Sequence, residues 1–488
     1  MFKSFMKLFI GSFIGKVIGF LREIIIAYFY GTSIPVSTFR VAQSATLIPI
    51  NFFTSDALNA GFIPLYNHYK KLSFRKAQSL FWLLVFVFFV LSIFISFILF
   101  FYASYGVTLI APGFDEKAHI LATNFIKIMS IGVPFYILSS LFSYLAISNN
   151  LYFLASIRPT IQSIGIIIGV VFAYFFDNIL LFAWGFTGAY ILFFLIGLFF
   201  LKNQKLLKFY FSYIKESIRD FWNNIKPLLL LPLILQGNIV IEKIVASLIG
   251  ANVIAAVEYA KFITETGVVL LAVPLGLVGL SSLSNLTIEE MKNKLTNIIP
   301  IILIITIPIS LFLFIYSDLI VSLIFKRGAF TQNSVFVTKS ILIGLSLSFW
   351  AQILSYVMIK SLNAQRKNKD VVIVMTFSLI SNAIFNLVFY KLLGPITIGL
   401  GASVYNIILV ILTVNKLKML KFFFKILFFL FVGSIICYLV ISQIFILNSF
   451  KEIMFSILFF VLYWISYINS IPLLRNFLNI LLKKFKGL

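Results

Sequence analysis

The sequence has little of what most enzymes and secreted proteins need. It contains one cysteine, two histidines and only 15 acidic residues among 488. The single Cys437 excludes an intramolecular disulfide framework, and the distant His68 and His119 exclude a histidine-based metal site. We therefore expect no metal and no cofactor. Charged residues of both signs make up 11% of the chain, against roughly 25% in soluble proteins.

Apolar residues, by contrast, make up 61% of the chain and form long runs. A helix needs about 20 apolar residues to cross a bilayer, and we count fourteen such segments, which predicts an all-α membrane protein. The predicted spans are 8–30, 36–62, 79–103, 119–147, 155–176, 179–201, 227–249, 252–285, 296–316, 334–360, 370–390, 395–415, 423–443 and 452–473.

The chain has a net charge of +24, and its basic residues are concentrated in alternate loops. Lysine and arginine gather at 70–76, 202–226, 360–369 and 416–421 and again near the end of the chain, at 475–486. The positive-inside rule predicts that these loops and both termini lie on the cytoplasmic side of a bacterial plasma membrane. The charge thus indicates topology and contact with anionic lipids, and we expect no nucleic-acid partner.

A short internal echo predicts two related halves. Pro112 opens a loop that leads to Lys127 and Gly132, and Arg327 opens one that leads to Lys339 and Gly344. Each glycine follows its lysine by the same spacing. Spans three and four would then match spans nine and ten, giving two parallel-repeat six-helix lobes around a central cavity. The predicted organisation is a first lobe at 1–201, a cytoplasmic amphipathic linker at 202–226, a second lobe at 227–415 and two added helices with a basic tail at 416–488.

Charged residues inside the predicted spans indicate a binding site. Lys16, Arg22 and Glu23 lie within the first span, although a charge at the bilayer centre costs roughly 2.5–3.5 kcal/mol on insertion scales. We therefore predict that they face a water-filled cavity. The polar residues of the second span recur near one helical stripe. They are Ser37, Arg40, Ser44, Asn51, Ser55 and Asn59.

The seventh and eighth spans repeat this pattern. Glu258, Lys261 and Glu265 are spaced to share one helix face, and Glu242 with Lys243 adds a second pair. The alternative is that these are buried ion pairs that only fix helix register. If they line the cavity, its positive excess suits a large anionic, hydroxyl-rich head group, with Lys and Arg holding phosphate and Ser and Asn holding sugar or peptide.

Motifs for energy coupling or catalysis are missing from the sequence. The stretch from Gly11 to Lys16 has the wrong spacing for a P-loop and lies inside a predicted membrane helix. The loops are short and basic, and contain no nucleophile with its base. We predict a transporter and no enzyme, although an integral-membrane enzyme acting on lipid-linked glycans is an alternative.

Five stretches resemble the MurJ/MviN family of lipid II flippases, and the similarity extends over the whole chain. They are Gly15–Glu23, similar to the family's opening helix, Gly61–Pro64, Ala111–Phe114, Tyr259–Phe262 running on to Pro274–Gly276, and Phe325–Thr331.

The resemblance implies the multidrug/oligosaccharidyl-lipid/polysaccharide exporter fold, with a V-shaped cavity and two final helices that form a groove for a lipid tail. It implies alternating access that carries an undecaprenyl-diphosphate-linked saccharide from the inner to the outer leaflet. In the family, basic residues of the first, second and eighth helices engage the diphosphate, and Lys16 and Arg22 occupy two of those positions. We predict that the head group is bound by Lys16, Arg22, Glu23, Arg40, Asn51 and Lys261.

The sequence departs from the family pattern at Ser37, Ile50–Asn51 and Lys261–Phe262, where the family usually has Asp, an arginine pair and Asp-Arg. One hypothesis is that Arg40 and Lys261 restore the lost positive charge. The departures leave two substrates open, lipid II or another lipid-linked glycan such as an O-antigen or capsule precursor. A small-molecule antiporter on the same fold is a further alternative. The expected partners are the glycan substrate and membrane lipids, and we expect the protein to be a monomer.

Overall fold

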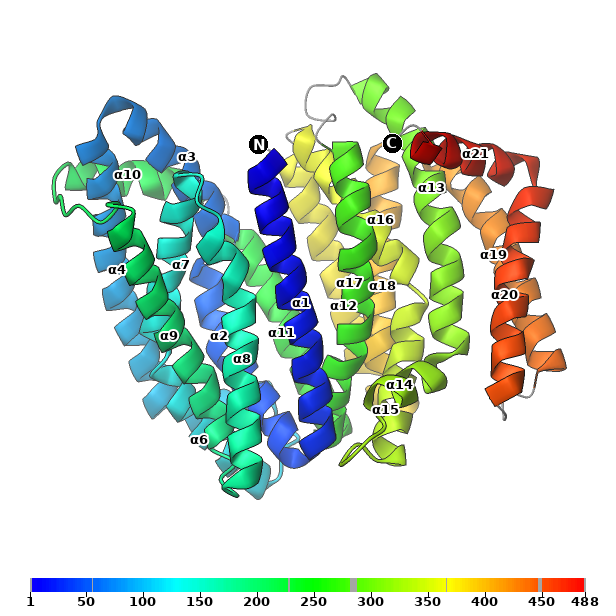
Figure 1. Cartoon of the computed structure of the whole chain (residues 1–488), viewed down its shortest axis with the longest axis horizontal. Helices are drawn as coiled ribbons and strands as arrows, with labels where there is room; N and C mark the ends of the chain where they lie inside the picture. Colours follow the sequence, from blue (N-terminus) through cyan, green and yellow to red (C-terminus); the bar gives the residue numbers. More distant parts are fainter. Residues whose placement is uncertain are drawn as a thin grey trace. The chain divides into compact units, whose positions relative to one another are not determined.

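A computed structural model describes residues 2–54, 56–226, 229–280, 288–365, 367–445 and 450–486. All the regular elements in these ranges are helices, which confirms the all-α fold class (Figure 1). The first ten are α1 (Phe2–Tyr30), α2 (Ile34–Thr54), α3 (Asp56–Leu72), α4 (Phe74–Phe101), α5 (Ala103–Ile110), α6 (Glu116–Ser130), α7 (Val133–Ser148), α8 (Phe153–Phe175), α9 (Leu181–Asn203) and α10 (Ile214–Ile225). The others are α11 (Leu230–Ile249), α12 (Ala251–Leu280), α13 (Ile288–Ile315), α14 (Ser317–Phe325), α15 (Gln332–Ser346), α16 (Phe349–Ala364), α17 (Asn368–Leu393), α18 (Ile396–Lys416), α19 (Leu420–Ile444), α20 (Phe450–Ser470) and α21 (Pro472–Lys486).

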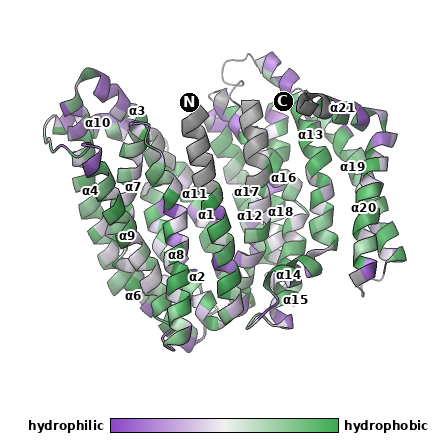
Figure 2. Ribbon diagram, in the orientation of Figure 1, coloured by the Kyte–Doolittle hydropathy of each residue, from purple (hydrophilic) through white to green (hydrophobic). Residues whose placement is uncertain are grey.

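Long apolar runs explain why these segments form membrane helices. The 28 residues of α4 are mostly Phe, Leu, Ile and Val, and at 1.5 Å per residue they rise about 42 Å. That exceeds the hydrocarbon core of a bilayer, which is about 30 Å thick. Figure 2 shows hydrophobic residues along most of α4 and α9, whereas hydrophilic residues gather in α3 and α10.

Nine helices in the described ranges are long and apolar enough to cross a membrane, and two further pairs form bent spans. The bent pairs are α6 with α7 and α15 with α16, each bent by 48°. The sequence predicts each pair as one span, at 119–147 and 334–360, and does not indicate the bend. In the first pair, the chain breaks at Gly132 and restarts with Pro134 in the first turn of α7, a combination that commonly kinks helices. The helices α1, α2 and α12 are outside this apolar set, and an arrangement of fourteen spans is compatible with these findings.

The echo between Lys127 and Lys339 does not place the two lysines at equivalent points. Lys127 lies in the last turn of α6, whereas the last turn of α15 contains no basic residue. Lys339 lies about one turn farther from the bend and forms an ion pair with Asp318 at 2.8 Å. The two bent spans therefore resemble each other in shape more closely than in the placement of their lysines.

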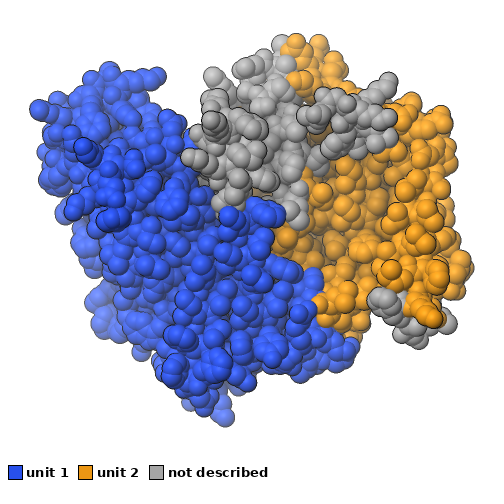
Figure 3. Space-filling model, in the orientation of Figure 1, with its two compact units in different colours: residues 1–259, 324–335 blue, residues 260–323, 336–488 orange. Residues whose placement is uncertain are grey.

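The chain forms two compact units, which Figure 3 distinguishes by colour. The first comprises Met1–Tyr259 with Ile324–Val335, and the second comprises Ala260–Leu323 with Phe336–Leu488. The boundary between the units falls inside α12, inside α14 and again inside α15. The first unit thus includes a short segment from the second half of the chain.

In the first unit, α8 packs closely against both α1 and α9. It runs parallel to α1, because Gly15 packs against Pro159 while Phe29, near the other end of α1, lies with its ring centroid 4.6 Å from that of Tyr174. Between α8 and α9 the contact is tighter still. A Cβ added to Gly165 would lie 2.5 Å from the Cβ of Ala189, and one added to Gly185 would lie 2.4 Å from the Gly165 carbonyl oxygen. Small residues thus let the two backbones touch, as in many membrane helix pairs.

The linker between α9 and α11 is held against α3 and α4. The hydroxyl of Tyr69 donates a hydrogen bond of 2.8 Å to Asp220 in α10, which lowers the pKa of that carboxyl group, and Lys76 pairs with Glu216 at 2.6 Å. The opposite side of α10 exposes apolar residues at helical spacing, Ile214, Ile218 and Trp222. An exposed apolar face beside basic residues fits the predicted amphipathic linker, and its contact with lipid stays a prediction.

The second unit uses the same small-residue contacts. A Cβ added to Gly344 in α15 would lie 2.7 Å from the carbonyl carbon of Gly399 in α18. Tyr463 and Tyr467 of α20 donate hydrogen bonds to the carbonyl oxygens of Gly433 and Phe429 in α19, at 2.8 and 2.6 Å. These bonds join the two helices that the sequence assigns to a lipid-tail groove, and the groove stays a prediction.

Candidate functional site

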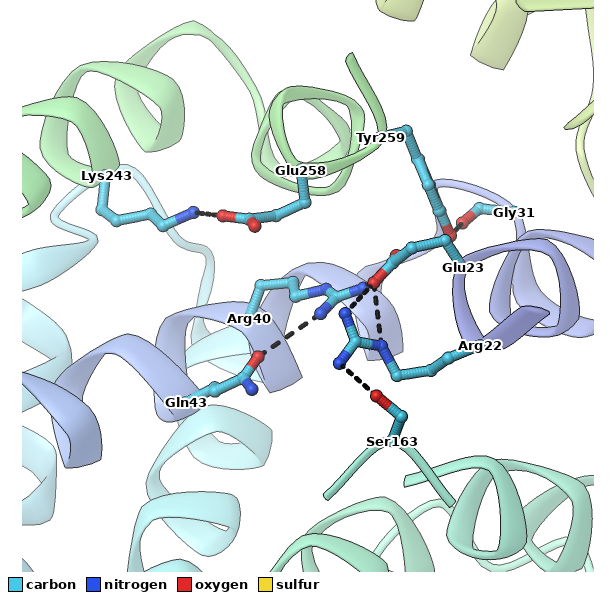
Figure 4. A network of polar contacts seen from close by, with 9 residues as sticks. All are labelled: Arg22, Glu23, Gly31, Arg40, Gln43, Ser163, Lys243, Glu258 and Tyr259. Atoms are coloured by element: carbon cyan, nitrogen blue, oxygen red, sulfur yellow. Dashed lines mark hydrogen bonds and ion pairs between the residues drawn. The ribbon is translucent and has the colours of Figure 1, made fainter. Parts of the chain in front are cut away.

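A buried carboxylate in the first unit lies between two arginines (Figure 4). Glu23 of α1 is 1% exposed and contacts Arg40 of α2 at 2.5 Å through one carboxylate oxygen. Its other oxygen contacts Arg22 at 2.5 Å, from Nη2, and at 3.0 Å, from Nε. We call Arg22, Glu23 and Arg40 the arginine–glutamate triad. It carries a net charge of +1 in a part of the chain expected to lie within the membrane.

The turn between α1 and α2 explains how the sequence brings the triad together. Gly31 has a φ of +56°, which glycine adopts readily, and it lets the chain reverse between the two helices. Glu23 and Arg40 lie at similar distances before and after this turn, so their side chains meet at the same depth. Because an unpaired buried charge is strongly destabilising, the ion pair is needed wherever Glu23 is buried.

The two arginines differ in how much they can offer a ligand. Arg40 is 4% exposed, and its Nη1 donates to Gln43 at 3.4 Å, while its buried Nε has no hydrogen-bond partner among the described residues. Arg22 is 17% exposed, and its Nη1 makes one long hydrogen bond, 3.4 Å, to the hydroxyl of Ser163 in α8. Arg22 is therefore the member of the triad whose donors a ligand can reach most easily.

A second ion pair joins α11 to α12 beside the triad. Lys243, which is 2% exposed, contacts Glu258, which is 33% exposed. The charge of Glu258 acts on Arg40, so the pair lies within electrostatic range of the triad. The sequence predicts that Lys261 lies between Glu258 and Glu265, and that arrangement stays a prediction beside the pairing of Glu258 with Lys243. The adjoining Glu242 is buried in α11.

Lys261 and Glu265 lie in the part of α12 that belongs to the second unit. Lys261 is half-buried and Glu265 is exposed. Their predicted roles, binding for Lys261 and cavity lining for Glu265, stay predictions.

The polar stripe of the predicted second span, 36–62, extends over α2 and the beginning of α3. The described part of α2 runs to Thr54 and that of α3 begins at Asp56. Ser37 is buried, and Ser44 and Asn51 are half-buried. Ser55 lies outside the described residues, as does the side chain of Asn59.

Lys16 lies in α1 on the side of the triad where that helix begins. It is half-buried, and its neighbour Gly15 packs against Pro159 of α8. Within the described ranges no hydrogen bond or ion pair joins Lys16 to another side chain, so its ammonium group remains available to an anion. The described residues contain no cluster of His, Cys, Asp and Glu side chains that could hold a metal ion.

The segment from Phe325 to Ser334 docks onto the α1–α2 turn, a contact that sequence patterns did not indicate. The amide of Ala329 donates to the carbonyl oxygen of Tyr28 at 2.8 Å, and the hydroxyls of Thr32 and Ser334 are 2.8 Å apart. Tyr259 of α12 donates to the carbonyl oxygen of Gly31 at 2.8 Å, and its ring packs on Phe325 and Phe330. This docking ties the α1–α2 turn to Tyr259 of α12.

Replacing Gly328 with alanine is expected to destabilise this docking. Gly328 has a φ of +58°, and an added Cβ would lie 2.2 Å from the Tyr28 carbonyl oxygen. The backbone strain alone is of order 1–3 kcal/mol, and the clash adds to it. Gly394 is a matched control, because it also has positive φ, +62°, but nothing lies within 4 Å of its added Cβ. Thermal unfolding in detergent should show a larger loss for Gly328→Ala than for Gly394→Ala; equal losses would mean that the contact with Tyr28 is not formed.

The arrangement as a whole suits non-covalent binding of an anion. Arg22 and Lys16 offer several charged donors, and a guanidinium can hold a phosphate or carboxylate with two parallel hydrogen bonds. Glu23 fixes the orientation of both triad arginines. Ser163 and Gln43 add neutral hydrogen-bonding groups at the edges of the triad.

Comparison with known proteins finds relatives along nearly the whole chain. Residues 26–466 match the family model described as lipid II flippase MurJ. A probable lipid II flippase MurJ of Buchnera aphidicola subsp. Baizongia pistaciae (strain Bp) is 27% identical over 437 residues, covering 86% of this chain and 84% of the relative. Lipid II flippase MurJ of Thermosipho africanus (strain TCF52B) is 25% identical over 418 residues, covering 84% of each chain.

Solved structures share the fold. A structure of lipid II flippase MurJ in an inward closed conformation matches with a TM-score of 0.83 and 24% identity, covering 95% of this chain and 98% of that one. An inward-facing multidrug resistance MATE family transporter of the MOP superfamily matches with a TM-score of 0.66 and 15% identity, covering 83% and 95%. The polytopic all-α architecture inferred from hydropathy thus has counterparts among solved membrane transporters.

Proposed function

We propose, from the premise that this chain belongs to the lipid II flippase MurJ family, that it carries lipid II across the bacterial plasma membrane. The substrate is an undecaprenyl-diphosphate-linked saccharide–peptide, which moves from the inner to the outer leaflet by alternating access. The observation that carries the proposal is the buried, net positive arginine–glutamate triad on the first two helices. Such a group has a clear use in a membrane protein that binds a diphosphate.

The triad suggests how a charged head group is held and released. In the empty carrier, Glu23 pairs with both arginines and offsets one of their two charges, so neither cation is buried without a partner. When a diphosphate arrives, Arg22 turns its fork toward the phosphate oxygens while Arg40 stays bound to Glu23. Because Glu23 remains beside Arg22, it competes with the phosphate and keeps binding reversible, which a carrier requires.

The orientation and organisation of the chain complete this proposal. Both termini and the basic loops lie in the cytoplasm, residues 1–201 and 227–415 form the two lobes, and 416–488 contribute the groove for the lipid tail. The protein acts as a monomer, catalyses no covalent step and binds no nucleic acid. Support comes from the distribution of lysine and arginine along the sequence and from membership of a transporter family.

A second candidate substrate is a different undecaprenyl-diphosphate-linked glycan, such as an O-antigen or capsule precursor. The observation that favours it is the pair Ile50–Asn51, which stands where the family usually has two arginines. A triad that binds the diphosphate would serve either substrate. The sugar and peptide contacts would then decide between them.

The test is complementation in a bacterium depleted of its own lipid II flippase, with labelled lipid II followed to the outer leaflet. We expect growth to be rescued and label to reach the outer leaflet. If the protein is present in the membrane and label stays inside, lipid II is not its substrate. A parallel strain that lacks its O-antigen flippase tests the second candidate, and rescue of that strain alone would replace the first proposal with the second.

A further inference from the structure

Arg158 of α8 is an intramembrane arginine that the triad does not include. It is half-buried, and within the described ranges no carboxylate pairs with it. Its guanidinium carbon lies 4.3 Å from the ring centroid of Tyr136 in α7, the geometry of a cation–π contact. A ring orients a guanidinium but does not neutralise its charge, so Arg158 keeps donors for an anion.

The side chain of Arg158 extends into the membrane and away from the nearer surface. α7 ends at Ser148 and α8 begins at Phe153, so a short turn at the membrane surface joins them. Arg158 is five residues, or about 8 Å, along α8 from this turn, whereas Tyr136 is twelve residues, or about 18 Å, along α7 from it. Since the guanidinium lies over Tyr136, it points toward the middle of the bilayer. This excludes the simple explanation that Arg158 reaches outward to the lipid head groups.

Polar groups surround this guanidinium on several helices. The rings of Tyr136 and Tyr190 of α9 lie 4.2 Å apart, and the hydroxyl of Tyr190 is buried without a hydrogen-bond partner in the described part of the chain. The hydroxyl of Tyr144 lies within electrostatic range of Arg158 and donates a hydrogen bond of 2.5 Å to the carbonyl oxygen of Thr54, at the end of α2. Arg158 therefore lies near the inner end of the polar stripe of α2.

Arg158 also lies beside the triad. Ser163, the hydrogen-bond partner of Arg22, is five residues farther along the same helix. The charges of Arg158 and Arg22 both act on the hydroxyl of Tyr190, which places that hydroxyl within electrostatic range of both. Because Gly15 packs against Pro159, Lys16 and Arg158 are at about the same depth. Lys16 and Arg158 thus both lie nearer than Arg22 to the side where the parallel helices α1 and α8 begin.

We propose that Arg158, positioned by Tyr136, is a second anion-binding residue of the transport site and holds an acidic group of the substrate's head group. This inference rests on the proposed function. On the expected topology Arg158 lies on the cytoplasmic side of Arg22, so a head group entering from the inner leaflet meets Arg158 and Lys16 before the triad. The acidic group is either a phosphate of the diphosphate linkage or a carboxylate of the attached peptide.

Binding of two lipids to the purified protein in detergent, measured by native mass spectrometry, separates these two sources. Undecaprenyl diphosphate carries only the phosphates, whereas lipid II carries the phosphates and the peptide carboxylates. Arg158→Gln is expected to weaken lipid II binding by about 10- to 100-fold, the effect of losing a hydrogen bond to a charged group. Weaker binding of both lipids assigns Arg158 to a phosphate, and weaker binding of lipid II alone assigns it to a carboxylate. Unchanged binding of both lipids would overturn the inference.

Two further comparisons distinguish binding from a structural role. Tyr136→Leu removes the ring and should weaken binding as Arg158→Gln does, whereas Tyr136→Phe keeps the ring and should not. Arg75→Gln is the matched control, because Arg75 lies 5.7 Å from the ring of Tyr210 but is exposed outside the predicted spans. If Arg158→Gln lowers the unfolding temperature and Tyr136→Phe binds as weakly as Tyr136→Leu, the arginine has a structural role and the inference is wrong. If the unaltered protein binds neither lipid, the proposed function itself fails.

Discussion

We expect that Arg22→Ala abolishes transport of lipid II, although the variant still folds and inserts into the membrane. Arg22 is the most accessible arginine of the triad, and its removal takes away the donors that a diphosphate would use. Two hydrogen bonds to a charged group at about 1.5 kcal/mol each amount to a loss on the order of 100-fold in substrate affinity. Folding is preserved because Glu23 remains paired with Arg40.

Transport in proteoliposomes, with thermal unfolding measured on the same preparation, tests this result. Arg219→Ala is the matched control, because Arg219 is also followed by a carboxylate, Asp220, but it is 72% exposed in the linker. We expect the control to transport normally. Full transport by Arg22→Ala would remove the triad from the binding mechanism, and a collapse of its stability would show that Arg22 is needed for folding instead.

Glu23→Gln is expected to cause the largest loss of stability among single changes at the site. It leaves Arg22 and Arg40 close together with no carboxylate between them, and Arg40 is almost fully buried. Removing one partner of a buried ion pair typically costs about 3–5 kcal/mol. Chemical denaturation in detergent would measure this, although refolding must first be shown to be reversible.

The double variant Glu23→Gln with Arg40→Gln supplies the decisive comparison. It removes the buried cation together with its counterion, so it should recover part of the stability that Glu23→Gln loses. If the stability loss of the double variant equals the sum of the losses of the two single variants, the pairing is contradicted, because residues that interact directly do not behave additively. Gln43, which contacts Arg40 only at 3.4 Å, offers a control with a small expected effect.

Hydropathy alone predicted most of the fold, because crossing a bilayer constrains the length and polarity of each helix directly. It did not predict the bends after α6 and α15, because apolar runs continue across both of them. These features depend on how helices pack, and single-residue hydropathy does not record packing. The bend at Gly132 had a local signal in Gly-Val-Pro.

The sequence predicted part of the candidate site, because the membrane also constrains where charged residues can lie. A charge inside a span stands out in the sequence, so Arg22, Glu23, Arg40 and Lys243 were found. The pairing of Lys243 with Glu258 was not, because it depends on how α11 and α12 are rotated against each other. Arg158 was overlooked, although a lone arginine followed by proline inside a predicted span is itself a signal. The hypothesis that Arg40 supplies a missing cation is not tested by its pairing with Glu23.

The glycine contacts between α8 and α9 have a mechanical consequence. Where Gly165, Gly169 and Gly185 meet, backbone lies on backbone, and no flexible side chains remain between the helices to act as a cushion. If one helix slid or tilted against the other, backbone carbonyl oxygens would collide with the neighbouring backbone. The two helices should therefore move as one rigid body. Ser163 on α8 and Tyr190 on α9 would then keep a constant separation throughout the transport cycle. Arg22 would therefore contact a surface that does not change shape as the carrier alternates between its conformations.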